Sequence, residues 1–406
     1  MSTVPAPLAV PAPRPLELDI FRAAGEAYRR AHTVPAQQAR VMHAIESCRT
    51  AEQGGHLSRC DSCAALVFRY HSCGNRHCPK CQTLSRERWV EARQDELLDT
   101  HYFHVVFTLP HELNPLAQGN PRLLYGLLFK AASETLQDFG RNPRWLGGEI
   151  GITMVLHTWG QNLGQHLHVH CIVTGGALSP EGDRWIPAKP TFLFPRPALS
   201  RVFRGKYIDF LRQAFANTKL RFAGSTAEFE VPARFERFLT QLRAHDWVVY
   251  LKPPFAGPER VVSYLGRYTH RVAISNNRLI SFEDGQVRFQ WRDYRHGNRC
   301  KTMTLRAEEL IRRFLLHTLP KGFMRIRHYG VCASRCRGVL LPACRAALEQ
   351  PAPEPRDPEP ADELMLRLTG IDVHQCPHCH VGRLVRIAIL EPLSRIHVGG
   401  RVIRPP

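Results

Sequence analysis

Three features that would place this chain in common functional classes are missing from its sequence. It has no run of about 18 apolar residues, so we expect no membrane-spanning helix. Its first 19 residues lack a basic start followed by an apolar core, so we expect no secretory signal. A glycine-rich loop of the GxxxxGKS/T kind is also missing, so we expect no ATP-driven motor in this chain.

Acidic residues are scarce relative to basic ones. The 406 residues include 55 Lys and Arg against 36 Asp and Glu, which gives a formal net charge of +19. Such a balance favours a polyanionic partner, and nucleic acid before a membrane because no basic amphipathic anchor is evident. Arginine, whose planar fork suits phosphate, is frequent between residues 267 and 299. We expect DNA contacts from Arg267, Arg271, Arg278 and Arg292.

Six of the thirteen cysteines form three Cys-x-x-Cys pairs near histidines, which favours zinc-bound thiolates in a reducing compartment over disulfides. Two such pairs lie in the N-terminal segment, and our basic prediction is one zinc held by both. An equally supported alternative adds a second zinc from two further cysteines and two histidines. The basic set is Cys60, Cys63, Cys78 and Cys81, and the added set is Cys48, His56, Cys73 and His77.

Near the C-terminus, Cys376 and Cys379 form another pair with knuckle spacing, which predicts a further zinc site. The sequence leaves its other ligands open. The candidates are Cys332 with Cys336, or Cys344, His374 and His380.

A third cluster consists of histidines that alternate along one strand-like segment, residues 166–176. Side chains of a strand alternate between its faces, so His166, His168 and His170 point the same way. Neutral imidazoles on one face suit a divalent metal, although an exposed His-rich strand is the plainer alternative. Residues 151–160 also resemble a strand, and a hairpin between the two would bring His157 opposite His168. For the third ligand, His157 and His166 compete, and Gln161 is an alternative.

Two tyrosines stand four residues apart in a segment that we expect to be helical, residues 258–268. Pro258 suits the first helical position, and Tyr264 and Tyr268 would share one face. The plainer interpretation is a core stripe. Beside a metal site in a basic chain, a phenolate could instead attack a phosphodiester and hold it covalently.

Together these residues resemble the HUH endonucleases, and more closely the two-tyrosine, rolling-circle transposases of the insertion sequence 91 family. Three blocks carry the resemblance in order: residues 75–82 (NRHCPKCQ), 166–176 (HLHVHCIVTGG) and 264–272 (YLGRYTHRV). They organise residues from about 40 to 340. The resemblance implies that Tyr264 and Tyr268 are nucleophiles and that His168 and His170 bind the catalytic metal. It also implies an α+β fold with an RRM-like or ferredoxin-like antiparallel sheet, flanking helices and Cys-rich zinc modules.

The function implied by the resemblance is DNA transposition. The enzyme would nick and rejoin single-stranded DNA through a 5′-phosphotyrosine, with catalytic Mg²⁺ or Mn²⁺ and structural Zn²⁺. Its partners would be single-stranded or hairpin element ends, target DNA and host replication proteins including a helicase, in the bacterial cytoplasm at the nucleoid. A plasmid replication initiator or relaxase of the same chemistry is one alternative. A non-catalytic zinc-dependent DNA-binding protein is the other.

Composition and pattern divide the chain into five segments. We predict a mobile tail at 1–18, a helical and Cys-rich zinc-binding domain at 19–99 and a catalytic domain at 100–345. An acidic, Pro-rich linker at 346–363 and a C-terminal Cys-x-x-Cys segment at 364–406 follow. Within 271–294 we expect a meander with tight turns at Asn276-Asn277 and Asp284-Gly285.

Overall fold

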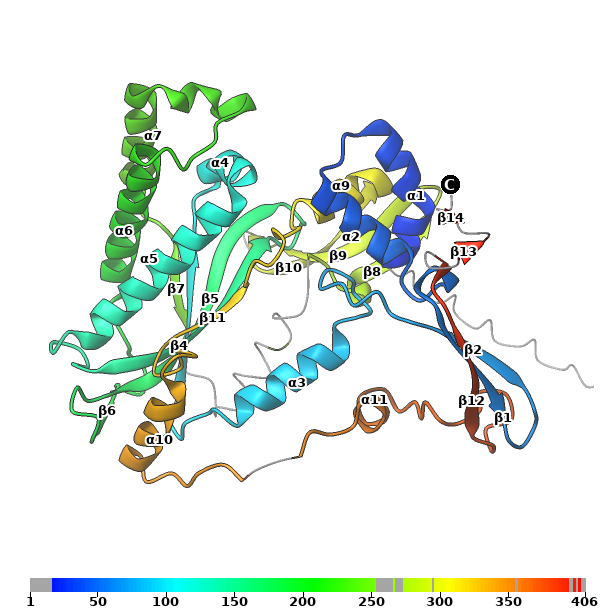
Figure 1. Ribbon diagram of the computed structural model, residues 1–406. Coiled ribbons are helices and arrows are strands. Elements are labelled where there is room, and N and C mark those ends of the chain that lie inside the picture. Colours follow the sequence, from blue (N-terminus) through cyan, green and yellow to red (C-terminus); the bar gives the residue numbers. More distant parts are fainter. Residues whose placement is uncertain are drawn as a thin grey trace, which may run out of the picture.

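The computed structural model describes residues 17–252, 266, 273–293, 296–354, 357–393, 397–398 and 401–402. Within them the chain combines antiparallel sheets with flanking helices (Figure 1), which confirms the predicted α+β class. Among these residues, no helix is long and apolar enough to cross a membrane.

A six-stranded antiparallel sheet forms the centre of the molecule. Its strands follow the order β11-β4-β5-β3-β7, and β6 pairs with the end of β5. The β4–β5 hairpin places His157 directly opposite His168, as the sequence predicted. The strands are β3 (Tyr102–Thr108), β4 (Glu149–Trp159), β5 (Gln165–Leu178), β6 (Trp185–Pro187), β7 (Val249–Lys252) and β11 (Ile326–Gly330).

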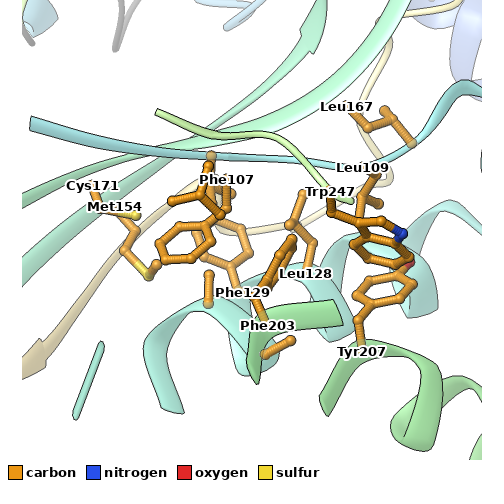
Figure 2. Close-up of a cluster of buried hydrophobic side chains, with 14 of the residues drawn as sticks. Phe107, Leu109, Leu128, Phe129, Met154, Leu167, Cys171, Phe203, Tyr207 and Trp247 are labelled. Carbon is orange, nitrogen blue, oxygen red and sulfur yellow. The ribbon is translucent and has the colours of Figure 1, made fainter. Parts of the chain in front are cut away.

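One face of this sheet is apolar and is covered by helices. Every second residue of β5, including Leu167 and Cys171, points into the main core, where Phe107 of β3 meets Phe129 and Phe203 of the helices (Figure 2). The rings of Phe107 and Phe203 lie 4.8 Å apart. The covering helices are α4 (Asn114–Gly119), α5 (Pro121–Arg141), α6 (Arg196–Ala216) and α7 (Pro232–Ala244).

The opposite face of the sheet carries a smaller group of buried apolar residues. Helix α3 (Thr83–Gln94) carries Trp89, which packs against a small cluster formed by Tyr102, Val155 and Ile172. Ile172 shares its face of β5 with His168 and His170, because all three are separated by even numbers of residues. The histidines therefore lie beside α3, on the face away from the main core.

A second core joins the N-terminal helices to the meander. Helix α1 (Glu17–Ala31) and helix α2 (Ala36–Glu46) pack with α9 (Ala307–Leu315) over one face of the meander. The meander consists of β8 (Leu279–Glu283), β9 (Gln286–Asp293) and β10 (Arg299–Arg306).

Of the two predicted meander turns, one is confirmed and one is wrong. Asp284 and Gly285 connect β8 and β9 with φ of 48° and 70°, as a type I′ turn requires. Asn276-Asn277 instead belongs to a 3₁₀ turn before β8. The Asn276 carboxamide oxygen accepts a hydrogen bond of 2.9 Å from the Glu17 amide, so this asparagine anchors the start of α1.

An N-terminal and a C-terminal segment of the chain meet in a third sheet, which has three strands. Strand β1 (Gly55–Cys60) pairs with β2 (Leu66–Tyr70) on one side and with β12 (Leu384–Leu390) on the other. This sheet lies apart from the central sheet (Figure 1). The remaining elements are η1 (Ala51–Gln53), η2 (His111–Leu113), η3 (Gly224–Glu230), η4 (Asn276–Arg278), α10 (Arg337–Ala347), α11 (Ala361–Thr369), β13 (His397–Val398) and β14 (Arg401–Val402).

Candidate metal centres

Three histidines of the β4–β5 hairpin converge on one point. His157 stands opposite His168, and His170 follows two residues further along β5. One ring nitrogen of each lies within 4.8 Å of the others. Strand alternation produces this geometry, because β5 directs its even-numbered side chains to the face away from the core. Of the three-ligand sets left open by the sequence, the structure brings together the one with His157.

Hydrogen bonding and burial keep the imidazoles of His168 and His170 in the form that binds metals. The Nδ1 of His168 lies 2.9 Å from the His166 carbonyl oxygen, so Nδ1 is the donor and Nε2 is left as the ligand atom. Desolvation by burial lowers the pKa of His168 to about 3, and the same cause lowers the pKa of His170. Neutral imidazole, the metal-binding form, therefore prevails at neutral pH.

A fourth histidine, His104, is within hydrogen-bonding distance of this group and was not predicted from the sequence. His104 Nε2 lies 2.8 Å from His170 Nδ1, and the two rings stack with centroids 5.0 Å apart. With Nδ1 engaged by His104, Nε2 is the atom through which His170 would bind a metal. The alternation of β3 puts His104 on the correct face, but its proximity to His170 depends on the pairing of β3 with β5, which is not a local signal.

The other two candidates for the third ligand lie outside this group. The His166 ring lies between those of His111 and His168, with centroids 5.3 Å and 4.8 Å away, but its nitrogens do not belong to the converging group. Gln161 lies in the hairpin connection, where its backbone carbonyl accepts a hydrogen bond from Arg278.

The predicted nucleophiles Tyr264 and Tyr268 lie outside the described residues, as do Arg267 and Arg271. Between the tyrosines, Gly266 is described as buried and helical. A Cβ atom at Gly266 would overlap the Val90 side chain of α3, so a larger residue there would require Val90 to move. Helix α3 is also the helix whose Trp89 packs on the face of the sheet that carries the histidines.

The two described arginines of the predicted DNA contacts differ in their surroundings. Arg278 bonds the carbonyl oxygens of Gln161 and Gln290, and it therefore ties the histidine hairpin to the meander. Arg292 is exposed on β9. Trp291 beside it packs against the second core, so its ring belongs mainly to the packing.

Four cysteines of the N-terminal segment form a compact centre, which we call the local centre. It consists of Cys48, Cys73, Cys78 and Cys81, whose sulfur atoms lie within 4.8 Å of one another. Cys81 Sγ lies 3.5 Å from Cys48 and 3.6 Å from Cys73. A tetrahedral zinc with Zn–S bonds of about 2.3 Å requires sulfurs about 3.8 Å apart, so this set fits zinc closely.

A second four-cysteine centre, which we call the split centre, joins the two ends of the chain. It consists of Cys60, Cys63, Cys376 and Cys379. Cys60 Sγ lies 3.7 Å from Cys379, and Cys63 Sγ lies 3.8 Å from Cys376. These distances again match the tetrahedral spacing of about 3.8 Å that a Zn–S bond of about 2.3 Å demands.

Backbone amides support thiolate ligands in the split centre. The Cys63 amide donates to Cys60 Sγ at 3.4 Å, and the Gly382 amide donates to Cys379 Sγ at 3.3 Å. The latter bond is the main cause that lowers the pKa of Cys379 to about 6. A Cβ atom on Gly382 would overlap the Cys60 sulfur, so glycine lets the two knuckles approach.

The cysteine grouping corrects the expected one. Cys60 and Cys63 join Cys376 and Cys379 and not Cys78 and Cys81, because the β1–β2 hairpin carries them to β12. The proposed partners Cys332, Cys336, Cys344, His374 and His380 are outside the split centre.

The two N-terminal histidines of the alternative zinc set are also outside both centres. Both ring nitrogens of His77 are engaged, Nδ1 near the Asn75 side-chain oxygen at 3.1 Å and Nε2 as acceptor from the Leu319 amide at 3.2 Å. His56 lies beside His71 instead, with ring centroids 6.0 Å apart.

Comparison with known proteins matches the histidine hairpin and the local centre to two different families. Residues 151–339, which include the histidine hairpin, match the family described as "Putative transposase". Residues 20–109, which include the local centre but only half of the split centre, match the family described as "Transposase zinc-binding domain". No solved structure matches the chain.

Two curated relatives align over most of their length. "Putative transposase y4qJ" of Sinorhizobium fredii is 51% identical over 380 residues, 93% of this chain and 96% of that protein. "Transposase for insertion sequence element IS801" of Pseudomonas savastanoi pv. phaseolicola is 28% identical over 334 residues, 82% of this chain and 78% of that protein. The protein therefore belongs to the insertion sequence 91 family of transposases, in which a zinc-binding domain precedes the transposase domain.

Proposed function

We propose that this transposase cuts and rejoins single-stranded DNA at the histidine face of its central sheet, through a covalent 5′-phosphotyrosine, and thereby drives rolling-circle transposition. The observation that carries the proposal is the convergence of His157, His168 and His170 on one point of the sheet face away from the main core. Three imidazole ligands leave coordination positions of a metal open, as a catalytic site requires and a structural site does not.

The imidazoles suit Mn²⁺ or a related ion directly, and Mg²⁺ when phosphate oxygens and waters complete its shell. When bound, such an ion supplies Lewis-acid polarisation of the scissile phosphate. His157, His168 and His170 would hold it, and His104 would orient His170 through their hydrogen bond.

Tyr264 and Tyr268 are the proposed nucleophiles. The phenolic oxygen of one would attack the phosphorus, the bond to the 3′ oxygen would break, and the phenolic proton would leave to base or solvent. The products are a 5′-phosphotyrosine and a free 3′ hydroxyl, which takes up a proton. The second tyrosine would permit another cleavage while the first end stays attached. The place of Gly266 against Val90 of α3, which borders the histidine face, supports this assignment.

The test uses labelled single-stranded DNA from the ends of the element, incubated with purified protein and Mn²⁺ or Mg²⁺. We expect a protein–DNA adduct that survives denaturation and disappears with chelator. A double Tyr264→Phe, Tyr268→Phe variant should still bind DNA but form no adduct. If the protein binds DNA from both ends of the element but forms no adduct with either metal, the chain binds DNA without cutting it and the proposal is wrong.

A further inference from the structure

A groove lies at the β1–β2–β12 sheet, where an N-terminal and a C-terminal segment meet, and we call it the end groove. This sheet is far from the central sheet that carries the histidines (Figure 1). The end groove has a volume of about 960 Å³ and lies between the β1–β2–β12 sheet and the segment that includes α11. The sheet contributes Arg69 and Arg386, and the C-terminal segment contributes Met365, Ile371 and Val373. Arg69 bonds the Val373 carbonyl oxygen and thus holds the two walls together.

The lining of the end groove is mainly basic, although Asp362 lies 2.9 Å from its His374. Arg49, Arg69, Arg386, His56, His71 and His374 all line it, and none of its described lining residues is acidic. Within the described part of the chain, neither Arg49 nor Arg386 lies within ion-pairing distance of a carboxylate, whereas many other arginines do, such as Arg212 with Glu236 at 2.8 Å. Unneutralised arginines that converge on one hollow attract a polyanion.

The titration of His56 reports the same electrostatic environment. Burial is the first cause that lowers its pKa, and the neighbouring His71, Arg69 and Arg386 lower it further. A proton on His56 is thus disfavoured by the positive groups around it, and a phosphate in the groove would relieve that repulsion.

Aromatic side chains border this basic hollow. Phe68 and Tyr70 of β2 line it and remain 56% and 40% exposed. An exposed phenylalanine gains little from water, but its face can stack on an unpaired base. A positive groove bordered by exposed aromatic rings is the usual arrangement for single-stranded nucleic acid.

We propose that the end groove binds the backbone of single-stranded nucleic acid, and that the split centre assembles the groove by fixing β12 against β1. Arg49 and Arg386 would contact phosphates, while Phe68 and Tyr70 would stack on bases. This site is separate from the cutting chemistry and would hold a strand at a distance from the histidine face.

The test measures fluorescence anisotropy of an oligothymidylate of about 20 nucleotides, long enough to span such a groove, with the zinc-loaded full chain over a range of salt concentrations. An Arg49→Gln, Arg386→Gln double variant removes two phosphate contacts. We expect affinity to fall about tenfold near physiological salt, and the slope of log K against log salt to shrink by about 1.4, because each contact on a single strand contributes about 0.7.

The matched control is Arg237→Gln, Arg243→Gln, which removes the same charge from exposed positions on α7, a helix remote from the β1–β2–β12 sheet (Figure 1). It should change affinity and slope little. Equal losses in both variants would mean a general charge effect and would overturn the proposal. The double lysine variant of Arg49 and Arg386 should recover most of the affinity, which a folding defect would not allow.

A second pair of variants tests the role of the split centre. Cys376→Ser with Cys379→Ser should weaken oligothymidylate binding as much as the arginine variant, since β12 and its Arg386 lose their anchor. Unchanged binding would show that the groove forms without the metal, and would overturn that half of the proposal. Because adduct formation depends on the histidine face, Tyr264→Phe with Tyr268→Phe should leave the groove measurements unchanged, so the two proposals can fail independently.

Discussion

The histidine group and the split centre differ in how many metal-coordination positions they fill and in whether their ligands come from one segment or from two distant ones. The split centre has four sulfur ligands, which complete a tetrahedral shell, and backbone amides reinforce them. The histidine group offers three imidazoles from one hairpin and leaves further positions for a substrate. Closed shells are typical of structural zinc, and open ones of catalytic metals. One chain therefore separates the metal that holds its ends together from the metal that we propose for chemistry.

The largest effect should follow from opening the split centre. Cys376→Ser should release one of two zinc equivalents, because three sulfurs hold zinc far more weakly than four, and structural zinc sites contribute on the order of 10 kcal/mol to folding of their module. Metal content by mass spectrometry checks the stoichiometry.

Thiol alkylation then identifies which cysteines the lost zinc had protected. In Cys376→Ser, Cys60 and Cys63 should become reactive although they are more than 300 residues away, whereas Cys48, Cys73, Cys78 and Cys81 should stay protected. Joint exposure of Cys60, Cys63, Cys78 and Cys81 would instead restore the grouping predicted from local spacing.

A smaller effect, on the stability of the central sheet, should follow from a change on the reverse side of the histidine strand. Leu167 stands between His166 and His168 but points into the main core, where it is fully buried. Leu167→Ala should lower the free energy of unfolding by about 2–5 kcal/mol through lost burial and the cavity left behind. Denaturant unfolding of the zinc-loaded protein measures this loss. Zinc stoichiometry should not change, and a loss of zinc would mean that the two regions are coupled.

The next effect separates the two candidates for the third metal ligand. His157→Ala removes a member of the three-histidine group and should reduce metal-dependent adduct formation about 100-fold or more. His166→Ala, its matched control on the same face, should reduce it much less. Adduct rates across a Mn²⁺ titration measure both. The reverse order would place His166, and not His157, in the catalytic shell.

Local pattern predicted much of the histidine region and little of the split centre. The alternation of β5 and a short connection sufficed to place His157 opposite His168, because all these residues lie within one hairpin. The partners of Cys376 depend on the pairing of β12 with β1, across more than 300 residues, and no local spacing encodes that pairing. The turn prediction for Asn276-Asn277 was wrong for a related reason. The Asn276 side chain accepts a hydrogen bond from the Glu17 amide, which is about 260 residues away in the sequence. The roles of the histidines and tyrosines, and the domain boundaries, stay predictions.

The smallest effect concerns a histidine that burial keeps neutral without any metal. His317 lies at the end of the β4–β5 hairpin, with Nδ1 3.2 Å from Thr158 Oγ1 and Nε2 3.0 Å from the Leu163 carbonyl oxygen. Desolvation by burial lowers the pKa of His317 from 6.5 to about 4. The unfolded chain therefore binds a proton at a higher pH than the native chain, and stability falls as pH drops from 6.5 toward 4.

Between pH 6.5 and 5 this histidine alone should remove about 1.5 kcal/mol from the free energy of unfolding. His317→Asn should be less stable at pH 7, because a buried contact is lost, but its stability should depend less steeply on pH across this window. Urea unfolding at pH 7, 6 and 5 measures the slope. The local surroundings thus distinguish His317, engaged at both ring nitrogens, from His168, whose Nε2 stays open to a ligand. An unchanged slope would mean that His317 titrates in the native state as it does in the unfolded chain, and that burial does not protect it.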